Sequence, residues 1–401
     1  MMELFEKFSG IKKLQDNLLR TGISPFQVTT EVLVDPSHGR VEGTESVIAC
    51  SNNYLGLTFD RTCITAAKRA LDTLGTGTTG SRMASGNYLE HIRLENELAR
   101  FFHTKHAIIF PTGFSATMGI SSTIAGPGET ILLDADVHAS LYDGARLSGA
   151  KIIRFKHNDM ADLDKKLARL GNEACRSAII VEGIYSMLGD TAPLETIVAL
   201  KQKYRACLVV DEAHSMGVLG DTGGGLTEKT GLGNEVDFIV GTFSKSLGAI
   251  GGYCVSNHSA LEQVRFAARS YIFSASLPPS VVASTRAALG MIARATKLRQ
   301  KLWSNAEYLY QGLSELGLQL GPETSPIIAV IIDDAQQALS WWRSLMQRGI
   351  YVNLIIPPAT PSGYSLLRCS VSAAHSLEQI DAILDAFRAV VTNQLSGSHQ
   401  G

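Results

Sequence analysis

The stretch Gly241-Thr242-Phe243-Ser244-Lys245-Ser246-Leu247-Gly248 directly follows Val236–Val240, an apolar run rich in β-branched and aromatic residues. Such a run predicts a buried strand. A strongly hydrated lysine is costly at the end of a buried strand unless it has a chemical use. A desolvated amine can form a Schiff base with an aldehyde cofactor, and the hydroxyls of Thr242 and Ser244 can bind a phosphate. Taken alone, the stretch is equally consistent with a solvated lysine in a glycine-rich turn.

Apolar strands alternate with helical or polar stretches on both sides of this lysine. The seven expected strands are Ala107–Phe110, Thr130–Leu133, Lys151–Phe155, Ser177–Val181, Cys207–Val210, Phe238–Val240 and Gly252–Val255. This rhythm predicts an α/β fold with a large, mostly parallel seven-stranded sheet that helices cover on both faces. A long helical stretch over 280–317 then leads to a smaller α+β unit.

The chain divides by pattern into four predicted segments. They are an N-terminal helix and arm (1–45), a large domain (46–285), a small C-terminal domain (286–392) and a flexible tail (393–401). Apolar residues recur at helical spacing over 3–20, which predicts a helix packed on the chain's own core or on that of a partner. A helix lying on a membrane surface is the less favoured interpretation, because such helices usually have a strongly basic polar face and this one does not.

The composition favours a cytoplasmic enzyme. The chain has 401 residues, 45% of them hydrophobic and 18% charged, with a formal net charge of −2. This balance is that of a globular protein and argues against a nucleic-acid surface, which needs a concentrated basic face. We find no apolar run of membrane-spanning length and no signal-peptide core. The six cysteines lack CxxC spacing, so reduced thiols are expected rather than disulfides or zinc.

Chemically useful residues follow several of the expected strands. In an open α/β sheet, ligands bind at the carboxyl ends of the strands, so these residues are expected to share one site. In chain order, the segments after the strands are Pro111-Thr112-Gly113-Phe114, Asp134–Ser140 with His138, Glu182–Ser186, Asp211-Glu212-Ala213-His214 and the segment carrying Lys245.

Asp211 and Lys245 together indicate pyridoxal phosphate (PLP). An aspartate against a pyridine nitrogen keeps that nitrogen protonated, and a lysine holds the aldehyde carbon of the cofactor. The turn at Gly113 leads into a helix, whose free N–H groups favour a phosphate. His138 offers an imidazole that can stack on a flat ring. Each residue also has a structural explanation, such as a helix cap or a core histidine, and only their shared position favours the cofactor.

Three other motifs carry less weight. Gly75–Gly80 matches GxGxxG but follows a helical stretch rather than a strand, so a NAD-dependent dehydrogenase is the last of the alternatives. Asp211–His214 spells the helicase box, yet the chain has no GxxxxGK[ST] loop. The same residues have no second His/Cys cluster to complete a metal site, so no metal is expected.

The segment Thr242–Gly251 resembles the lysine signature of the α-oxoamine synthases, which are fold-type I PLP enzymes related in fold to aspartate aminotransferase. The resemblance covers about residues 45 to 390. It includes Ser51-Asn52-Asn53-Tyr54-Leu55-Gly56, Gly80-Ser81-Arg82, Asp211–Gly217 and Leu367-Arg368-Cys369-Ser370. Within this family the sequence is most similar to the bacterial serine palmitoyltransferases, through Glu182–Asp190, Tyr271–Ser280 and Pro357–Pro361.

The resemblance implies a role for each matching residue. Lys245 binds the cofactor aldehyde and moves the substrate α-proton, Asp211 pairs with the pyridine nitrogen, and His138 stacks on the ring. The other implied contacts are His214 to the phenolic oxygen; Gly113, Phe114, Thr242, Ser244 and, from a partner subunit, Ser274 to the phosphate; Ser186 beside the cofactor; and Asn53 and Arg368 to the amino-acid carboxylate. Close relatives can carry a further arginine just before Pro357, where this chain has Ile355-Ile356.

The resemblance further implies the reaction and its partners. A decarboxylating Claisen condensation of L-serine with palmitoyl-CoA would give 3-oxosphinganine, CO2 and CoA, the first step of sphingolipid synthesis. The active site would be shared across a homodimer in the cytoplasm, with possible peripheral contact at the inner membrane face. A sister synthase of the 8-amino-7-oxononanoate synthase or glycine C-acetyltransferase type, or a non-catalytic scaffold subunit, are the alternatives.

Overall fold

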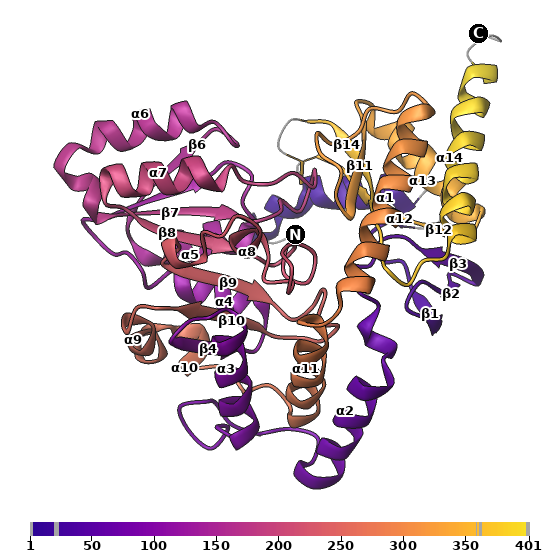
Figure 1. Cartoon of the computed structure of the whole chain (residues 1–401). Helices are drawn as coiled ribbons and strands as arrows, with labels where there is room; N and C mark the ends of the chain where they lie inside the picture. The colour runs from indigo at the N-terminus through magenta and orange to yellow at the C-terminus, as the bar shows by residue number, and fades with distance from the viewer. Residues whose placement is uncertain (1–2, 20–23, 358, 361–362, 398–401) are drawn as a thin grey trace.

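The computed structural model describes residues 3–19, 24–357, 359–360 and 363–397. Its centre is a seven-stranded sheet of order β4-β10-β9-β8-β7-β5-β6, in which β10 is antiparallel to both neighbours and the other pairs are parallel (Figure 1). The strands are β4 (His106–Phe110), β5 (Thr130–Asp134), β6 (Lys151–Phe155), β7 (Ser177–Glu182), β8 (Cys207–Asp211), β9 (Phe238–Thr242) and β10 (Gly252–Ser256). All seven expected strands and the α/β fold class are confirmed.

Helices cover both faces of this sheet because alternate strand residues point to opposite sides. On β7, Ile180 joins a core with helices α4, α5, α9 and α10, while Ile179 and Val181 join a second core with α3, α6, α7 and α11. The helices of this part are α2 (Arg61–Leu74), α3 (Leu89–Phe101), α4 (Gly113–Ser121), α5 (Ala139–Ser148), α6 (Met160–Leu170), α7 (Leu194–Tyr204), α8 (Leu226–Lys229), α9 (Ala260–Ala267), α10 (Arg269–Ile272) and α11 (Pro279–Ile292).

A second, smaller lobe contains two further sheets and lies beside the large one in Figure 1. Its strands and helices are β1 (Thr30–Asp35), β2 (His38–Val41), β3 (Thr44–Ile48), β11 (Ile327–Ile332), β12 (Ile350–Tyr351), β13 (Asn353–Ile355), β14 (Ser365–Ser370), α12 (Thr296–Glu315), α13 (Ala335–Gln347) and α14 (Leu377–Gly397). Strand β12 pairs in parallel with β3, so a C-terminal strand completes the N-terminal sheet. The division of the chain into the predicted domains stays a prediction.

The predicted helix over 280–317 is two helices, α11 and α12, with a break at residues 293–295. The break separates the part of the chain that packs on the large sheet from the part that packs on the small lobe. The flexible tail stays a prediction: residues 393–397 of it continue α14, and the remainder, 398–401, lies outside the described residues. Among the helices of the described ranges, none combines the length and apolarity needed to cross a membrane.

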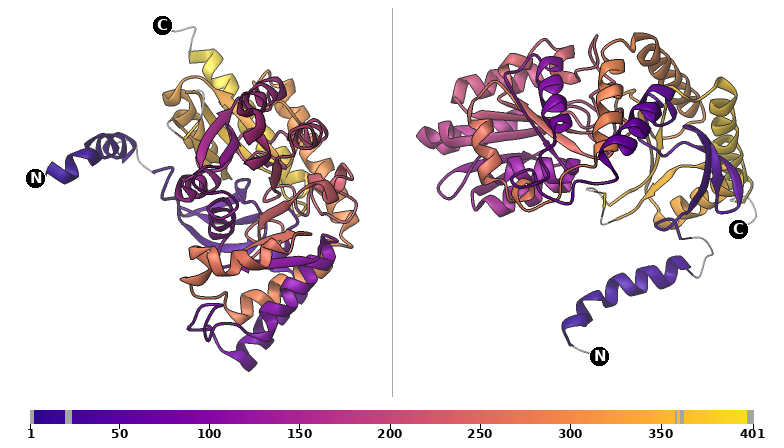
Figure 2. Two further views of the ribbon diagram at one scale, coloured as in Figure 1. Left: turned by 90° about the vertical axis from the view of Figure 1, so that its left-hand side faces the viewer. Right: turned by 90° about the horizontal axis from the view of Figure 1, so that it is seen from below.

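The N-terminal segment forms a 3-10 helix, Glu3–Phe8, followed by α1 (Ser9–Leu19), and projects away from the body in both views of Figure 2. Leu4, Phe5, Phe8 and Ile11 are between 48% and 66% exposed. The predicted helix is therefore present, and these four apolar side chains do not pack on the chain's own core. Packing on a partner and contact with a membrane surface both stay predictions. Residue 20, the end of the predicted range, lies outside the described residues.

Candidate active site

The carboxyl ends of the parallel strands meet at a pocket of about 350 Å³. Its lining residues are Thr112, Gly113, Phe114, Thr117, His138, Ser140, Glu182, Asp211, Ala213, His214, Gly241, Thr242, Ser244, Lys245, Ile250 and Gly251. The pocket therefore brings together eight of the twelve residues that the sequence singled out. The volume falls within the range of about 300–1,000 Å³ that is usual for cofactor and ligand sites.

Lys245 and Asp211 form the charged centre of the pocket. Asp211 ends β8, and Lys245 follows the neighbouring strand β9 by three residues. Burial lowers the pKa of the Lys245 amine, and the Asp211 and Glu182 carboxylates oppose that shift. Burial raises the pKa of the Asp211 carboxyl, which the Lys245 charge opposes in turn. A lysine held in this way is a stronger nucleophile near neutral pH than a solvated lysine.

The beginning of α4 forms an anion-binding end to the pocket. Thr112 caps this helix, because its Oγ1 accepts a hydrogen bond from the N–H of Ser115 at 2.9 Å. The N–H groups of Gly113 and Phe114, in the first turn, have no carbonyl partner within the helix. A Cβ atom at Gly113 would lie 2.6 Å from Thr242 Oγ1, so only glycine fits there. Thr242 Oγ1 lies 2.8 Å from Ser244 Oγ, which places two hydroxyls beside these N–H groups.

His138 lies at the mouth of the same pocket and caps α5. Its Nδ1 accepts from the N–H of Ser140 at 3.3 Å and lies 2.7 Å from Ser140 Oγ. Because Nδ1 accepts, the neutral ring carries its proton on Nε2. Burial and the Lys245 charge both lower the pKa of His138, so the ring is neutral at physiological pH. A neutral imidazole that is exposed to the pocket is suited to stacking on the ring of a cofactor.

Glu182 is a pocket residue that the sequence analysis did not select. It ends β7, is buried, and accepts a hydrogen bond from the backbone N–H of His138 through Oε1. Burial raises the pKa of this carboxyl, and the charge of Asp211 raises it further. The strand-end rule that selected Asp211 applies equally to Glu182 and would have found it.

The predicted carboxylate-binding residues lie beside the pocket rather than in its lining. Arg368 is buried on β14, and its Nη2 donates to Asn52 Oδ1 at 3.2 Å. Asn53 donates through Nδ2 to Thr58 Oγ1 at 2.7 Å. Arg368 Nε and Asn53 Oδ1 are buried without a hydrogen-bond partner among the described residues. These open polar groups are suited to a bound ligand with both acceptor and donor groups.

His214 links the pocket to the N-terminal part of the chain. Its Nδ1 lies 2.7 Å from the hydroxyl of Tyr54, a residue of the family motif at 51–56. Burial lowers the pKa of His214 well below its usual value, and the charges of Lys245 and Arg368 add to this effect. Arg368 is therefore near enough to act on the pocket's charges, although it does not line the pocket.

Two predicted cofactor residues do not line the pocket of a single chain. Ser186 is half-buried in the loop after β7, and Ser274 follows α10. Ser274 was expected from a partner subunit, and its position outside its own chain's pocket is compatible with that prediction. Both contacts stay predictions.

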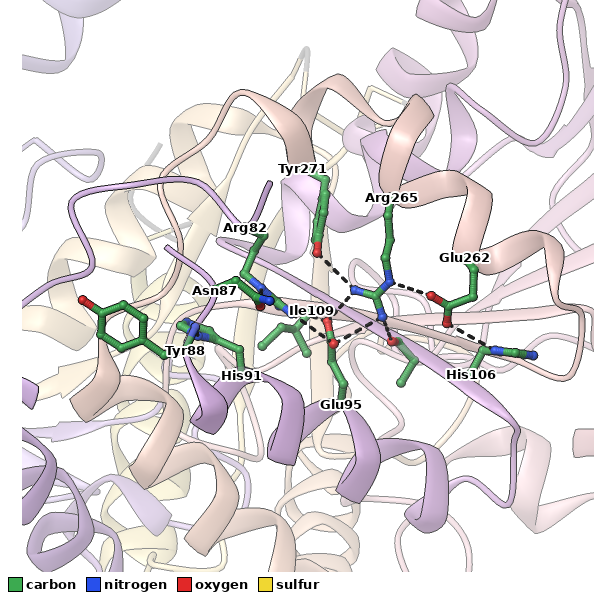
Figure 3. Close-up of polar contacts among 11 residues, drawn as sticks. Arg82, Asn87, Tyr88, His91, Glu95, His106, Ile109, Glu262, Arg265 and Tyr271 are labelled. Carbon is green, nitrogen blue, oxygen red and sulfur yellow. Dashed lines mark hydrogen bonds and ion pairs between the residues drawn. The ribbon is translucent and has the colours of Figure 1, made fainter. Parts of the chain in front are cut away.

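Figure 3 shows an ion cluster in which Glu95 lies between the guanidinium groups of Arg82 and Arg265. Both oxygens of Glu95 are bound by the guanidinium groups of Arg82 and Arg265, at 2.9 to 3.2 Å. Glu95 Oε1 also accepts from the N–H of Ile109 on β4 at 3.1 Å. Arg82 belongs to the loop whose Gly80 carbonyl accepts from the N–H of Ser276 at 2.9 Å. The family motif at 80–82 therefore ties Ser274's segment to the strand that leads to Gly113.

We expect Glu95→Ala to destabilise the fold by about 3–5 kcal/mol, because it leaves the buried guanidinium of Arg82 without a carboxylate and leaves the half-buried Arg265 with Glu262 alone. Urea denaturation of both proteins measures the change. Glu45→Ala is the control, since Glu45 pairs with Arg40 at 3.3 Å while both side chains are more than half exposed. That pair is worth less than about 1 kcal/mol. Equal losses in the two variants would contradict the central role of Glu95.

Comparison with known proteins gives the family. The family described as aminotransferase class I and II matches residues 46–387. The serine palmitoyltransferase of Caulobacter vibrioides is 50% identical, with 96% of each chain covered. The chain belongs to this aminotransferase family and, within it, to the α-oxoamine synthases. A Lysinibacillus sphaericus 8-amino-7-oxononanoate synthase is 38% identical over 87% of this chain and 90% of the relative.

A solved α-oxoamine synthase supports the cofactor. A structure of serine palmitoyltransferase with a PLP internal aldimine has a TM-score of 0.94 to this chain at 46% identity, and covers 97% of this chain and 98% of the other. The pocket here fits PLP on its own geometry. The glycine-only contact at Gly113 leaves room for a phosphate at the start of α4, and the buried Asp211 and Lys245 suit a pyridine nitrogen and an aldehyde. The predicted cofactor is confirmed.

Proposed function

We propose that this α-oxoamine synthase condenses L-serine with palmitoyl-CoA and releases CO2 and CoA, giving 3-oxosphinganine. In this reaction the serine α-carbon bonds to the acyl carbon, the thioester C–S bond breaks, and the serine carboxyl group leaves as CO2. The observation that carries the proposal is the joining of Lys245 and Asp211 in one pocket, in a chain that is 50% identical to a serine palmitoyltransferase. The choice of serine over other amino acids rests on the similarity to the serine palmitoyltransferases, because the pocket residues support the cofactor chemistry and not one amino acid.

Each pocket residue has a defined task in this proposal. PLP, when bound, withdraws electrons from the α-carbon of the amino acid. Lys245 holds the cofactor aldehyde and, once displaced by serine, takes the α-proton on its amine. Asp211 holds the proton on the pyridine nitrogen, and His138 stacks on the ring. His214 contacts the phenolic oxygen of the cofactor.

The remaining proposed residues bind the phosphate and orient the substrate. Gly113, Phe114, Thr242 and Ser244 hold the cofactor phosphate, with Ser274 of a second subunit, and Ser186 lies beside the ring. Arg368 and Asn53 bind the serine carboxylate, which sets the bond that breaks perpendicular to the ring. The position where relatives can carry a second arginine is Ile356 here, and this side chain is buried in the core. We therefore assign binding of the serine carboxylate to the guanidinium of Arg368 alone among the arginines considered.

A second subunit is also part of the proposal. Phe114 and Ile250 line the pocket yet are 45% and 51% exposed, and Phe273, next to Ser274, is 72% exposed. Large apolar side chains around a pocket mouth indicate a covering surface, and a second copy would bring Ser274 to it. Sedimentation of the purified chain, of 43.1 kDa, tests for the dimer. Flotation with phospholipid vesicles tests whether the exposed N-terminal helix contacts a membrane.

We expect the purified protein to form 3-oxosphinganine from serine and palmitoyl-CoA, and to do so at least about 10-fold faster than with glycine or alanine in place of serine. A specificity of this size needs only one well-placed contact to the serine hydroxyl. Mass spectrometry of the product and CoA release measure both rates. Faster condensation of alanine with pimeloyl-CoA would instead favour the 8-amino-7-oxononanoate synthase type. No condensation of any amino acid by cofactor-loaded protein would favour a scaffold subunit.

A further inference from the structure

A second group of titratable residues lies next to the pocket, and none of them has a task in the reaction. His157 follows β6, the edge strand of the large sheet. Its Nδ1 lies 2.8 Å from Asp134 Oδ1 at the end of β5, and its Nε2 lies 2.7 Å from Asp190 Oδ2 in the loop after β7. The ring also packs edge-on against Tyr185, with ring centroids 4.4 Å apart. One imidazole thus joins the segments that follow the three neighbouring strands β6, β5 and β7.

Both nitrogens of His157 face carboxylates, so the ring must donate from both and carry a positive charge. The carboxylates raise the pKa of His157 to about 10, against the effect of burial. The neighbouring Asn158 strengthens the same junction. Its N–H donates to Asp134 Oδ2 and its Nδ2 to Asp190 Oδ2, each at 2.9 Å.

The two loops that His157 joins carry predicted cofactor residues. Asp134 begins the turn that leads to His138, since its Oδ1 accepts from the N–H of Asp136 at 2.9 Å. Asp190 closes the other loop, because its carbonyl accepts from the N–H of Tyr185 at 2.8 Å, next to Ser186. The contact between His138 and Glu182 is the third link between these loops. Moving the Asp134 carboxylate would therefore move the turn that leads to His138, and moving Asp190 would move the loop that carries Ser186.

We propose that the His157 side chain is a positioning residue of the active site, which clamps the loop bearing His138 to the loop bearing Ser186 through Asp134 and Asp190. It touches neither substrate nor cofactor and acts through these loops. The inference rests on the proposed function, because His138 must meet the PLP ring for its position to matter. A 1 Å displacement of such a group can cost about 100-fold in rate.

The charge of His157 gives the clamp a signature in pH. The charged and titratable groups around it are Asp134, Asp136, Arg154, Tyr185 and Asp190. The imidazolium lies between the carboxylates of Asp134 and Asp190, and it loses its charge as the pH rises through the pKa of His157, about 10. The clamp is therefore complete below that pH and weakens above it, whereas a glutamine at this position carries no charge at any pH. The ratio of kcat/KM between the wild type and His157→Gln should accordingly fall as the pH rises through about 10.

The test compares His157→Gln and Asn158→Gly with His258→Gln. Asn158 has a φ of 51°, which glycine adopts without strain, so this variant removes only the side-chain contacts. His258 also pairs with an aspartate, Asp237 Oδ1 at 2.9 Å, but at the opposite end of β9. Three quantities are measured for each protein: the Kd of the cofactor-free protein for PLP, kcat with serine and palmitoyl-CoA, and the pH profile of kcat/KM for serine.

We expect His157→Gln to raise the Kd for PLP and to lower kcat by about 10-fold each. The difference in kcat/KM from the wild type should shrink as the pH rises through about 10, where His157 loses its charge. Asn158→Gly should change Kd and kcat in the same direction by a smaller factor, and His258→Gln should leave all three unchanged. Folded variants with wild-type Kd, kcat and pH profile would overturn the clamp. Failure of the proposed function is distinguishable, because the wild type would then form no product while the PLP affinities of the variants still test His157.

Discussion

Lys245→Ala should lose turnover by at least about 10³-fold and should also lose the visible absorbance of lysine-bound cofactor. The substitution removes the amine that we propose holds the cofactor aldehyde and takes the α-proton, and general base catalysis alone contributes about 10²–10⁴-fold. The proposed phosphate contacts at Gly113 and Thr242 are unchanged, so PLP should still bind, although more weakly. Absorbance spectra of the PLP-loaded variant and product formation from serine and palmitoyl-CoA measure the two effects.

Lys203→Ala is the matched control for this variant. Lys203 is more than half exposed and pairs with Asp164 at 2.7 Å, away from the strand ends that form the pocket. It should keep both the spectrum and the rate of the wild type. A Lys245→Ala protein that kept the spectrum of lysine-bound cofactor would show that another lysine holds PLP. The assignment of this pocket would then be wrong.

The large sheet was predictable because each of its strands is a short apolar run. The residues of β5, β7 and β9 are fully buried, so each strand reads as a continuous run rather than as an alternating pattern. Once these strands are known to be parallel, their carboxyl ends must share one edge. That rule alone placed His138, Asp211 and Lys245 together.

Contacts between distant segments were not predictable in this way. Tyr54 meets His214 across 160 residues of sequence, and no local pattern marks the pair. Arg368 comes from β14 of the small lobe, and only the family resemblance pointed to it. The break between α11 and α12 was also missed, because apolar residues continue at helical spacing on both sides of it. What differs is the packing, since α11 lies against α2 and α3 while α12 lies against α14 and β11.

Asp211→Asn should separate cofactor binding from turnover. Asparagine keeps the shape of aspartate and the side-chain oxygen that accepts from the backbone N–H of Ala213 at 2.9 Å, but it has no charge to hold a proton on a pyridine nitrogen. We therefore expect kcat to fall by about 10²–10³-fold while PLP still attaches to Lys245. Product formation and absorbance spectra measure the two quantities on one sample. Asp60→Asn, at the N-cap of α2, is the control and should leave both unchanged.

The same substitution should move the attachment of PLP to lower pH. The Asp211 carboxylate opposes the effect of burial on Lys245, so its removal lowers the pKa of the amine further. A larger fraction of Lys245 is then neutral at a given pH below the wild-type pKa, and the neutral amine is the form that attacks the aldehyde. The rate of PLP attachment to cofactor-free protein, measured against pH, should rise at lower pH in Asp211→Asn than in the wild type. A shift to higher pH, or an unchanged kcat, would contradict the charge pairing on which the proposed chemistry depends.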